Sequence, residues 1–125
     1  MKRLGVLLVL LFSVSSFASG LDGYVRAREF ATRFANVISD NGNGTYTIGR
    51  EDDKARRLTV TPGSRLALVG TRKVTLDRGV KVDVRGLLIP PTALRYLGCS
   101  IAAKGTGEVM VKCDGTSYAI QRFAK

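Results

Sequence analysis

The chain contains no histidine, and this absence limits the chemistry available to its 125 residues. Without histidine, the Ser-His-Asp and Cys-His catalytic arrangements are excluded, and so are metal sites built on imidazole ligands. The lysines and carboxylates form no convergent set in the sequence, so a small enzyme that relies on them is only a third-ranked hypothesis. We therefore expect a non-catalytic protein with no catalytic, cofactor-binding or metal-ligating residues.

Cys99 and Cys113 are the only cysteines. If residues 99–103 and 108–113 pair as antiparallel strands, the two cysteines lie opposite each other, symmetrically about Thr106. Opposed Cβ atoms in such a pair are about 4.5–5.5 Å apart, close to the separation that a disulfide needs. We predict a disulfide here, with two reduced thiols as the alternative. A zinc site is disfavoured because two thiolates fill only half of its tetrahedral coordination.

Two further motifs resemble ligand sites, and both have a simpler interpretation. Residues 40–44 (Asp-Asn-Gly-Asn-Gly) look like the start of a calcium loop, but glycines occupy its third and fifth positions. A tight hairpin turn is the better interpretation, because Asn and Gly tolerate positive φ. The acidic triplet at residues 51–53 is followed by Lys54, Arg56 and Arg57. This pattern favours a self-compensating surface loop over a cation site or an acid–base pair.

Basic residues outnumber acidic residues by 20 to 10, which gives a net charge of +10. Such a charge favours anionic polymers, lipid headgroups, nucleic acid or acidic proteins as partners, although it also serves solubility alone. No tryptophan is present and no aromatic residue interleaves with the basic stripe of residues 65–85 named below, so we expect no specific nucleic-acid recognition. Six basic side chains are predicted to share the outer side of one sheet and to contact an anionic partner. They are Arg65, Arg72, Lys73, Arg78, Lys81 and Arg85.

The first 18 residues have the pattern of an export signal. Lys2 and Arg3 precede an uncharged run over residues 4–17 that is rich in Leu and Val, and Ser16 and Ala18 place small residues at the two positions that a signal peptidase recognises. The run is shorter than the roughly 20 residues that a spanning helix needs, so a retained anchor is the less favoured alternative. We predict a signal peptide over residues 1–18, export to the periplasm, envelope or exterior, and a mature chain that does not span the membrane.

The rest of the chain predicts a single α+β domain over residues 22–123. Two short helices are expected, at residues 24–34 with Phe30 and Phe34 packed inward, and at residues 92–97 with Gly98 as a left-handed terminator. Glycine-rich turns predict hairpins around residues 40–44, 70–71 and 104–107. Val80, Val82 and Val84 alternate with charged residues, which is typical of a strand with one buried face.

The chain also contains two segments of similar sequence pattern. Residues 25–48 and 89–111 each combine an amphipathic run, a small-residue stop, a strand, a glycine-rich turn and a second strand. From Phe34 and Leu97 onward the two segments align without a gap, so that Ala35 matches Gly98 and Gly42 matches Gly105. We therefore predict an internal two-fold repeat, with halves at about residues 24–60 and 65–123.

Residues 61–115 carry a motif set that resembles a known family. Leu76-Asp77 precedes a valine-rich strand, Gly86 precedes an Ile-Pro step at residues 89–90, and the following helix ends at Leu97-Gly98. This pattern is similar to the copper amine oxidase N-terminal-like domain, also called the stalk domain, of exported bacterial proteins. An earlier segment, YVRAREFATRF, looks like a second copy of the family's V-P-x-R-x-x-A helix.

The earlier copy has Arg28 at the family's arginine position and Arg26 in place of the usual proline, while Thr92 replaces the arginine in the later copy. The resemblance covers about residues 24–120. It implies a twisted antiparallel sheet packed around one or two short helices, used as an accessory binding or spacer module. No catalytic residue belongs to this domain, so the resemblance assigns none.

These observations lead to two functional expectations. The first is an exported, non-catalytic binding or scaffolding module that contacts an anionic envelope polymer or another exported protein through a basic sheet face. The second is a secreted inhibitor or chaperone-like partner of a protease or hydrolase, because a small disulfide-linked domain presents loops such as residues 40–44 rigidly.

Overall fold

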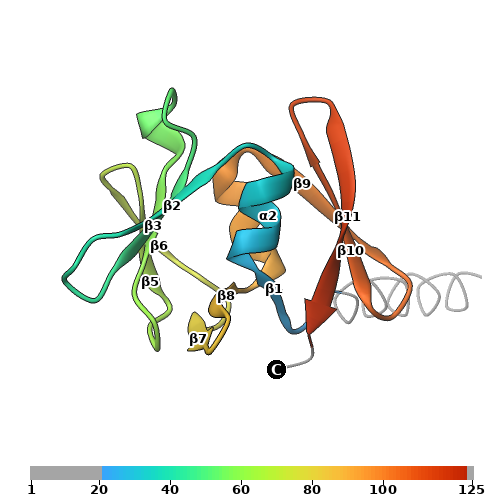
Figure 1. Cartoon of the computed structure of the whole chain (residues 1–125), viewed down its shortest axis with the longest axis horizontal. Helices are drawn as coiled ribbons and strands as arrows, with labels where there is room; N and C mark the ends of the chain where they lie inside the picture. Colours follow the sequence, from blue (N-terminus) through green and yellow to red (C-terminus); the bar gives the residue numbers. More distant parts are fainter. Residues whose placement is uncertain (1–20, 124–125) are drawn as a thin grey trace, which may run out of the picture.

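The computed structural model of the protein describes residues 21–123. Two antiparallel sheets lie on either side of a layer of short helical segments (Figure 1), in agreement with the predicted α+β class. The predicted signal peptide lies outside the described residues. Within residues 21–123, no helix is long and apolar enough to cross a membrane.

The larger sheet has six strands and includes both the first and the last strand of the described chain. Its spatial order is β7 (Lys81–Asp83), β8 (Gly86–Ile89), β1 (Tyr24–Arg26), β11 (Thr116–Phe123), β10 (Glu108–Cys113) and β9 (Cys99–Lys104). All neighbouring strands are antiparallel. Because β1 pairs with β11, Tyr24 lies opposite Phe123, and the two ends of the described chain are neighbours.

The smaller sheet has five strands that follow one another in sequence order. They are β2 (Val37–Asp40), β3 (Tyr46–Gly49), β4 (Leu58–Val60), β5 (Leu66–Val69) and β6 (Arg72–Thr75). Ile48 and Leu58 are paired and fully buried, whereas the neighbouring pair Thr47 and Thr59 joins its hydroxyls at 3.1 Å on the opposite face. Apolar residues therefore alternate with polar ones, as expected for a sheet with one covered face.

The helical layer consists of α2 (Ala27–Arg33) and the 3₁₀ segment η2 (Pro91–Leu97). Helix α2 contacts β1, β8 and β11 of the larger sheet as well as β2 and β3 of the smaller one. Phe30 is fully buried and Phe34 nearly so, with their ring centroids 5.2 Å apart, which confirms the predicted inward packing of both rings. A third short segment, η1 (Lys54–Arg56), lies in the connection between β3 and β4.

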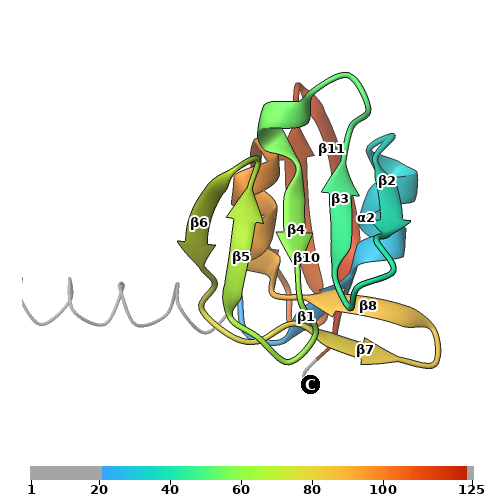
Figure 2. The same cartoon turned by 90° about the vertical axis from the view of Figure 1, so that its left-hand side faces the viewer.

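The expectation of a single sheet is wrong, because the strands divide into two sheets (Figure 2). The physical reason lies in α2, whose buried side chains face strands on both sides of the helix. One sheet would leave half of this apolar surface in water, and burial of apolar area is the main driving force for folding. The second sheet covers that half.

The first predicted helix begins later than expected. Residues 24–26 form strand β1, and only residues 27–33 are helical. Val25 lies opposite Arg122 of β11 on one side and Ile89 of β8 on the other. A central strand position with partners on both sides satisfies the backbone groups of this segment outside a helix, so tertiary pairing overrides the helical spacing.

The predicted buried valine face is also wrong for two of its three members. Val80 is 1% exposed, but Val82 is 48% exposed and Val84 is fully exposed. The reason is the position of β7, which forms the edge of the larger sheet and pairs only with β8. The hairpin of β7 and β8 extends beyond the core, so its tip has no apolar layer to pack against (Figure 2).

Gly98 ends η2 in the left-handed conformation, with φ of 82°, as the sequence predicts. Its backbone N–H donates to the carbonyl of Arg95 at 3.1 Å. A Cβ at this position would also collide with the guanidinium of Arg56, which lies against the glycine. The segment before it is a 3₁₀ helix that opens with Pro91 at its first position, where the missing N–H costs no hydrogen bond.

The disulfide is confirmed, and it joins the two strands in the expected register. Cys99 on β9 lies directly opposite Cys113 on β10, with the Cα atoms 4.4 Å apart. Both cysteines are buried and belong to the apolar core. No free cysteine remains in the described part of the chain.

Removal of the disulfide by Cys99→Ala/Cys113→Ala should lower the free energy of unfolding by about 3 kcal/mol, since the closed loop of about 15 residues restricts the unfolded chain. Urea unfolding of the oxidised protein and the double variant measures this difference. Wild-type protein that has been reduced and alkylated serves as the matched comparison. Equal unfolding free energies would contradict a stabilising role.

Gly98→Ala should destabilise the domain by about 1–2 kcal/mol, because alanine pays the steric cost of the left-handed conformation and displaces Arg56. The control is Gly107→Ala, where an added Cβ meets nothing within 4 Å and φ is not left-handed. Thermal or urea unfolding of both variants provides the measurement. An equal effect of the two substitutions would show that the left-handed cap contributes nothing.

Candidate functional site

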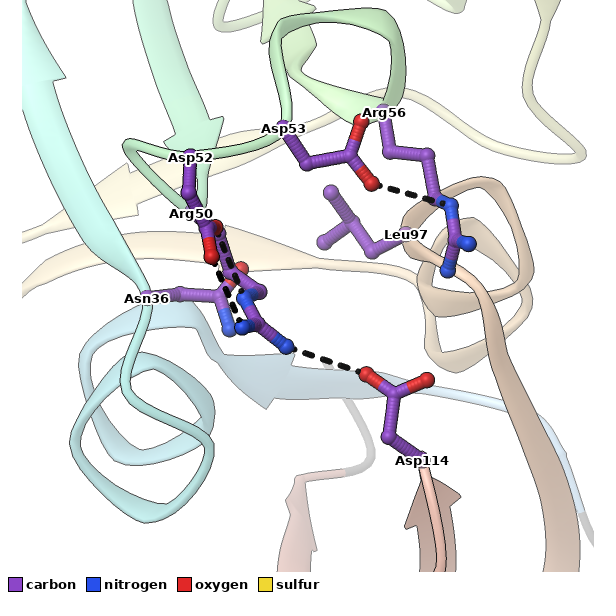
Figure 3. Close-up of a pocket in the computed structure, with 7 residues that line it drawn as sticks. All are labelled: Asn36, Arg50, Asp52, Asp53, Arg56, Leu97 and Asp114. Atoms are coloured by element: carbon purple, nitrogen blue, oxygen red, sulfur yellow. Dashed lines mark hydrogen bonds and ion pairs between the residues drawn. The ribbon is translucent and has the colours of Figure 1, made fainter.

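A polar cleft of about 310 Å³ opens between the two sheets beside η1 (Figure 3). It is formed where the connection from β3 to β4, the end of η2 and the turn from β10 to β11 meet. We call it the inter-sheet cleft. Its lining residues are Asn36, Arg50, Asp52, Asp53, Arg56, Leu97 and Asp114.

The charges of the inter-sheet cleft are paired with one another. Arg50 forms ion pairs with Asp52 at 3.0 Å and with Asp114 at 3.1 Å, and Arg56 pairs with Asp53 at 3.2 Å. The hydrogen bonds from Arg50 hold the pKa of the Asp52 carboxyl below its ordinary value. This pairing agrees with the predicted self-compensating loop. Every charged side chain that lines the cleft is thus paired with another charged side chain of the lining.

A second cavity, of about 350 Å³, adjoins the cleft on the side of the disulfide. It shares Arg50, Leu97 and Asp114 with the cleft and adds Arg33 and both cysteines. Because the two sulfurs are joined, neither supplies a thiolate as nucleophile or metal ligand. Within residues 21–123, no group of three or more acidic or cysteine side chains is placed to hold a metal ion.

The turn at residues 40–44 is held by its own hydrogen bonds. The Asp40 carboxylate accepts from the Gly42 N–H at 2.9 Å, and the Asn41 amide donates to the hydroxyls of Thr45 and Thr47, both at 2.9 Å. Gly42 and Gly44 have φ of 78° and 86°. The residues thus behave as a tight turn, the interpretation preferred over a calcium loop.

A larger and more open groove, of about 770 Å³, lies between α2 and the turn of the β7–β8 hairpin. We call it the basic groove, because four of its seven lining residues are arginines. The lining residues are Arg26, Arg28, Glu29, Thr32, Arg33, Val84 and Arg85. It is the candidate binding site of the described chain.

One of the four arginines is neutralised by an aspartate. Arg26 donates two hydrogen bonds to Asp83, at 3.0 and 2.8 Å, in the bidentate geometry that favours carboxylate recognition. Asp83 also accepts from the backbone N–H of Arg85 at 2.9 Å, which fixes the turn. Together these hydrogen bonds, that from Arg26 first, lower the pKa of Asp83 to about 2.

The other three arginines of the basic groove, Arg28, Arg33 and Arg85, have exposed side chains. Within residues 21–123 they form no ion pair, and Arg33 instead lies over the ring of Tyr118, 5.2 Å from its centroid. Glu29 is the only acidic lining residue. The basic groove therefore keeps a net positive charge, in contrast to the inter-sheet cleft.

The structure divides the six predicted basic residues between the two sheets, so they do not share one face. Arg65, Arg72 and Lys73 lie at β5 and β6 of the smaller sheet, where consecutive residues such as Arg72 and Lys73 point to opposite faces. The prediction of one basic face failed because it assumed a single sheet, whereas β5 and β6 belong to the smaller sheet and β7 belongs to the larger one.

Arg78, Lys81 and Arg85 lie instead at the edge of the larger sheet. Arg78 donates to the carbonyl of Gly23 at 2.6 Å, and its guanidinium approaches the Asp77 carboxylate at 3.6 Å. Lys81 sits over the ring of Tyr24, with Nζ 5.0 Å from the centroid. Of the six, only Arg85 lines the basic groove.

Sequence reasoning missed Arg28 and Arg33 as candidate contacts. Both lie on α2, and in the sequence they are simply the polar positions of an amphipathic helix. A signal was present nonetheless, because residues 26–33 contain three arginines and one glutamate. Their proximity to Arg85, more than 50 residues away in the chain, depends on β1 pairing with β8.

Comparisons with protein families, with curated proteins and with solved structures found no match to this chain. The site must therefore be interpreted from its own geometry and charge.

The Arg26–Asp83 pair predicts a pH-dependent contribution to stability. The pKa of Asp83 is lowered from 3.8 to about 2, so the ionised carboxylate stabilises the folded state above about pH 4, and this stabilisation disappears as pH falls through about 2. Asp83→Asn should therefore be less stable than wild type near pH 6 and equally stable below pH 2. Urea midpoints across this range test the expectation.

The control for this comparison is Glu108→Gln, which removes an exposed carboxylate that forms no ion pair within residues 21–123. It should leave the urea midpoint nearly unchanged at both ends of the pH range. A stability difference between Asp83→Asn and wild type that stays constant from pH 6 to below pH 2 would rule out the ion pair as its cause.

Proposed function

We propose that the protein is an exported, non-catalytic binding or scaffolding module at the cell envelope, which contacts an anionic polymer or another exported protein through exposed basic side chains. The observation that carries this proposal is that, in the described part of the chain, most acidic residues are paired with a basic residue, whereas most basic residues are unpaired. Within residues 21–123, six aspartates pair with only four arginines, namely Arg26, Arg50, Arg56 and Arg78. No charged residue of this segment is buried, so its excess of basic over acidic residues lies on the surface.

Part of the unpaired positive charge lies in two groups of exposed side chains. Arg28, Arg33 and Arg85 border an open groove, and Lys81 lies close by on the same hairpin. A second group lies at the β5–β6 hairpin of the smaller sheet, with Arg65 just before β5 and with Arg72 and Lys73 on the edge strand β6. An excess of positive charge on a surface attracts anionic partners. Both groups belong to the proposed contact surface.

The relationship to the stalk domain and the internal repeat form part of the same proposal. Helix α2 leads into β2 and β3, and η2 leads into β9 and β10, each pair antiparallel. The aligned residues Ala35 and Gly98 both have positive φ, of 54° and 82°, and so do the aligned Gly42 and Gly105. Matching backbone conformations at aligned positions support a duplicated unit that serves as a rigid scaffold.

A second candidate function is inhibition or chaperoning of a protease or hydrolase. One observation favours it, namely the exposed turn at residues 40–44 with its internal hydrogen bonds from Asn41 and to Asp40. A loop already held in one conformation loses little entropy when it binds an enzyme cleft. Recovery of one stoichiometric enzyme in a pull-down would favour this function over polymer binding.

The binding proposal predicts that the mature, oxidised protein is retained on envelope extract at low salt and released at about 1 M salt, where the screening length falls to about 3 Å. Arg28→Gln/Arg85→Gln should weaken low-salt retention, as should Arg72→Gln/Lys73→Gln. The charge-matched control is Lys104→Gln/Lys112→Gln on β9 and β10. Retention that is insensitive to salt, or equally weakened by all three double variants, would contradict contact through these two groups.

A further inference from the structure

The turn of the β7–β8 hairpin exposes apolar surface at its tip. Val84 is fully exposed and Val82 is 48% exposed, whereas Leu87 and Leu88, which follow the turn, are buried. Scattered exposed apolar residues are ordinary, but these two occupy one protruding hairpin (Figure 2). The hairpin lies at the sheet edge, where no other strand covers it.

Basic side chains surround this apolar tip. Arg85 is adjacent to Val84 in the turn, and Arg28 and Arg33 lie across the basic groove. The carboxylates nearby are Asp83, which is occupied by Arg26, and Glu29 on α2. The tip therefore combines a projecting apolar side chain with a predominantly cationic rim.

The hairpin is held in place rather than free to fold back. Asp83 accepts two hydrogen bonds from Arg26 on β1 and one from the Arg85 backbone within the turn. Strand β8 pairs with β1 beneath it, with Arg26 opposite Leu88. The exposed position of Val84 is thus built into the fold, and a partner meets it without first reorganising the turn.

We infer that the β7–β8 hairpin docks on an anionic membrane surface, with Val84 entering the boundary between headgroups and acyl chains and with Arg85 and Arg28 contacting lipid phosphates. This inference rests on the proposed function, because it uses the same exposed basic side chains, and it adds lipid headgroups to the anionic polymer or exported protein proposed there as partners. Interfacial segments bury their apolar face about 5–10 Å into this boundary. Basic residues near an anionic leaflet each strengthen binding about fivefold.

The apolar tip favours a lipid surface over the other anionic partners. A hydrated acidic polymer neutralises arginines but leaves Val84 in water, so it gives the exposed valine no role. Stable membrane attachment requires two signals, and this hairpin supplies an apolar insertion together with a polybasic rim.

Co-sedimentation with lipid vesicles tests the inference, with the mature, oxidised protein as the sample. Vesicles of phosphatidylcholine with phosphatidylglycerol should bind it, and vesicles of phosphatidylcholine alone should bind it much more weakly. Val84→Ser should reduce binding to the anionic vesicles about tenfold, because it removes the inserted apolar side chain. Arg85→Gln should reduce it about fivefold.

Two variants outside the hairpin serve as matched controls. Leu66→Ser removes an apolar side chain that is 67% exposed on the smaller sheet, and Lys112→Gln removes a positive charge from β10. Each should change vesicle binding less than about twofold, since neither lies at the docking surface. Circular dichroism melting of every variant separates a loss of binding from a loss of folding.

Two outcomes overturn the inference. One is anionic-vesicle binding that Val84→Ser leaves unchanged, and the other is failure to bind anionic vesicles at all. If vesicles fail while soluble polyglutamate binds in a salt-dependent way, the lipid assignment is wrong and the proposed function stands. If vesicles, polyglutamate and envelope extract all fail at low salt, both are wrong.

Discussion

Phe30 occupies the centre of the domain, and the burial of its ring between two sheets is the interaction on which the rest of the structure depends. The helix that carries it contacts strands of both sheets, and the buried residues of both sheets form one continuous apolar cluster with it. A short helix of this kind has little stability in isolation, so its conformation depends on the packing around it. The sheets in turn have no common strand, and the helical layer joins them.

The charged side chains around the core fall into two groups, those that hold the two sheets together and those that do not. In the inter-sheet cleft, Arg50 extends from the end of β3 to Asp114 in the turn between β10 and β11, so one side chain links both sheets where the core ends. The positive charge of Arg50 is neutralised by this ion pair and by its second one, with Asp52. At the basic groove, only Arg26 is engaged in this way, through Asp83. Of the remaining arginines of this groove, Arg33 lies over the ring of Tyr118, and none forms an ion pair within residues 21–123, so their positive charge is not neutralised.

Local features were predictable from the sequence because local physics determines them. The register of Cys99 opposite Cys113 follows from symmetry about a tight turn, and the left-handed backbone of Gly98 follows from the end of an apolar helical run. The partition into two sheets was not predictable, because a strand has the same alternation of apolar and polar residues whichever sheet it joins. The exposure of Val84 was not predictable for a related reason. Alternation of apolar and polar residues indicates a strand, but the position of that strand in the tertiary structure decides whether its apolar face is covered. The basic groove combines α2 with a distant hairpin, so it exists only after β1 and β8 have paired.

The pairing of β1 with β11 has a consequence for how such a domain can be combined with others. Tyr24 and Phe123 are opposite one another, so the chain enters and leaves the domain at the same place. A unit with this geometry can be inserted into a surface loop of a host protein without prising the flanking residues of the host apart. It also accepts circular permutation in principle, since a short linker closes the existing ends while an exposed turn such as residues 40–44 is opened. The topology thus allows the domain to be inserted into another protein as a unit.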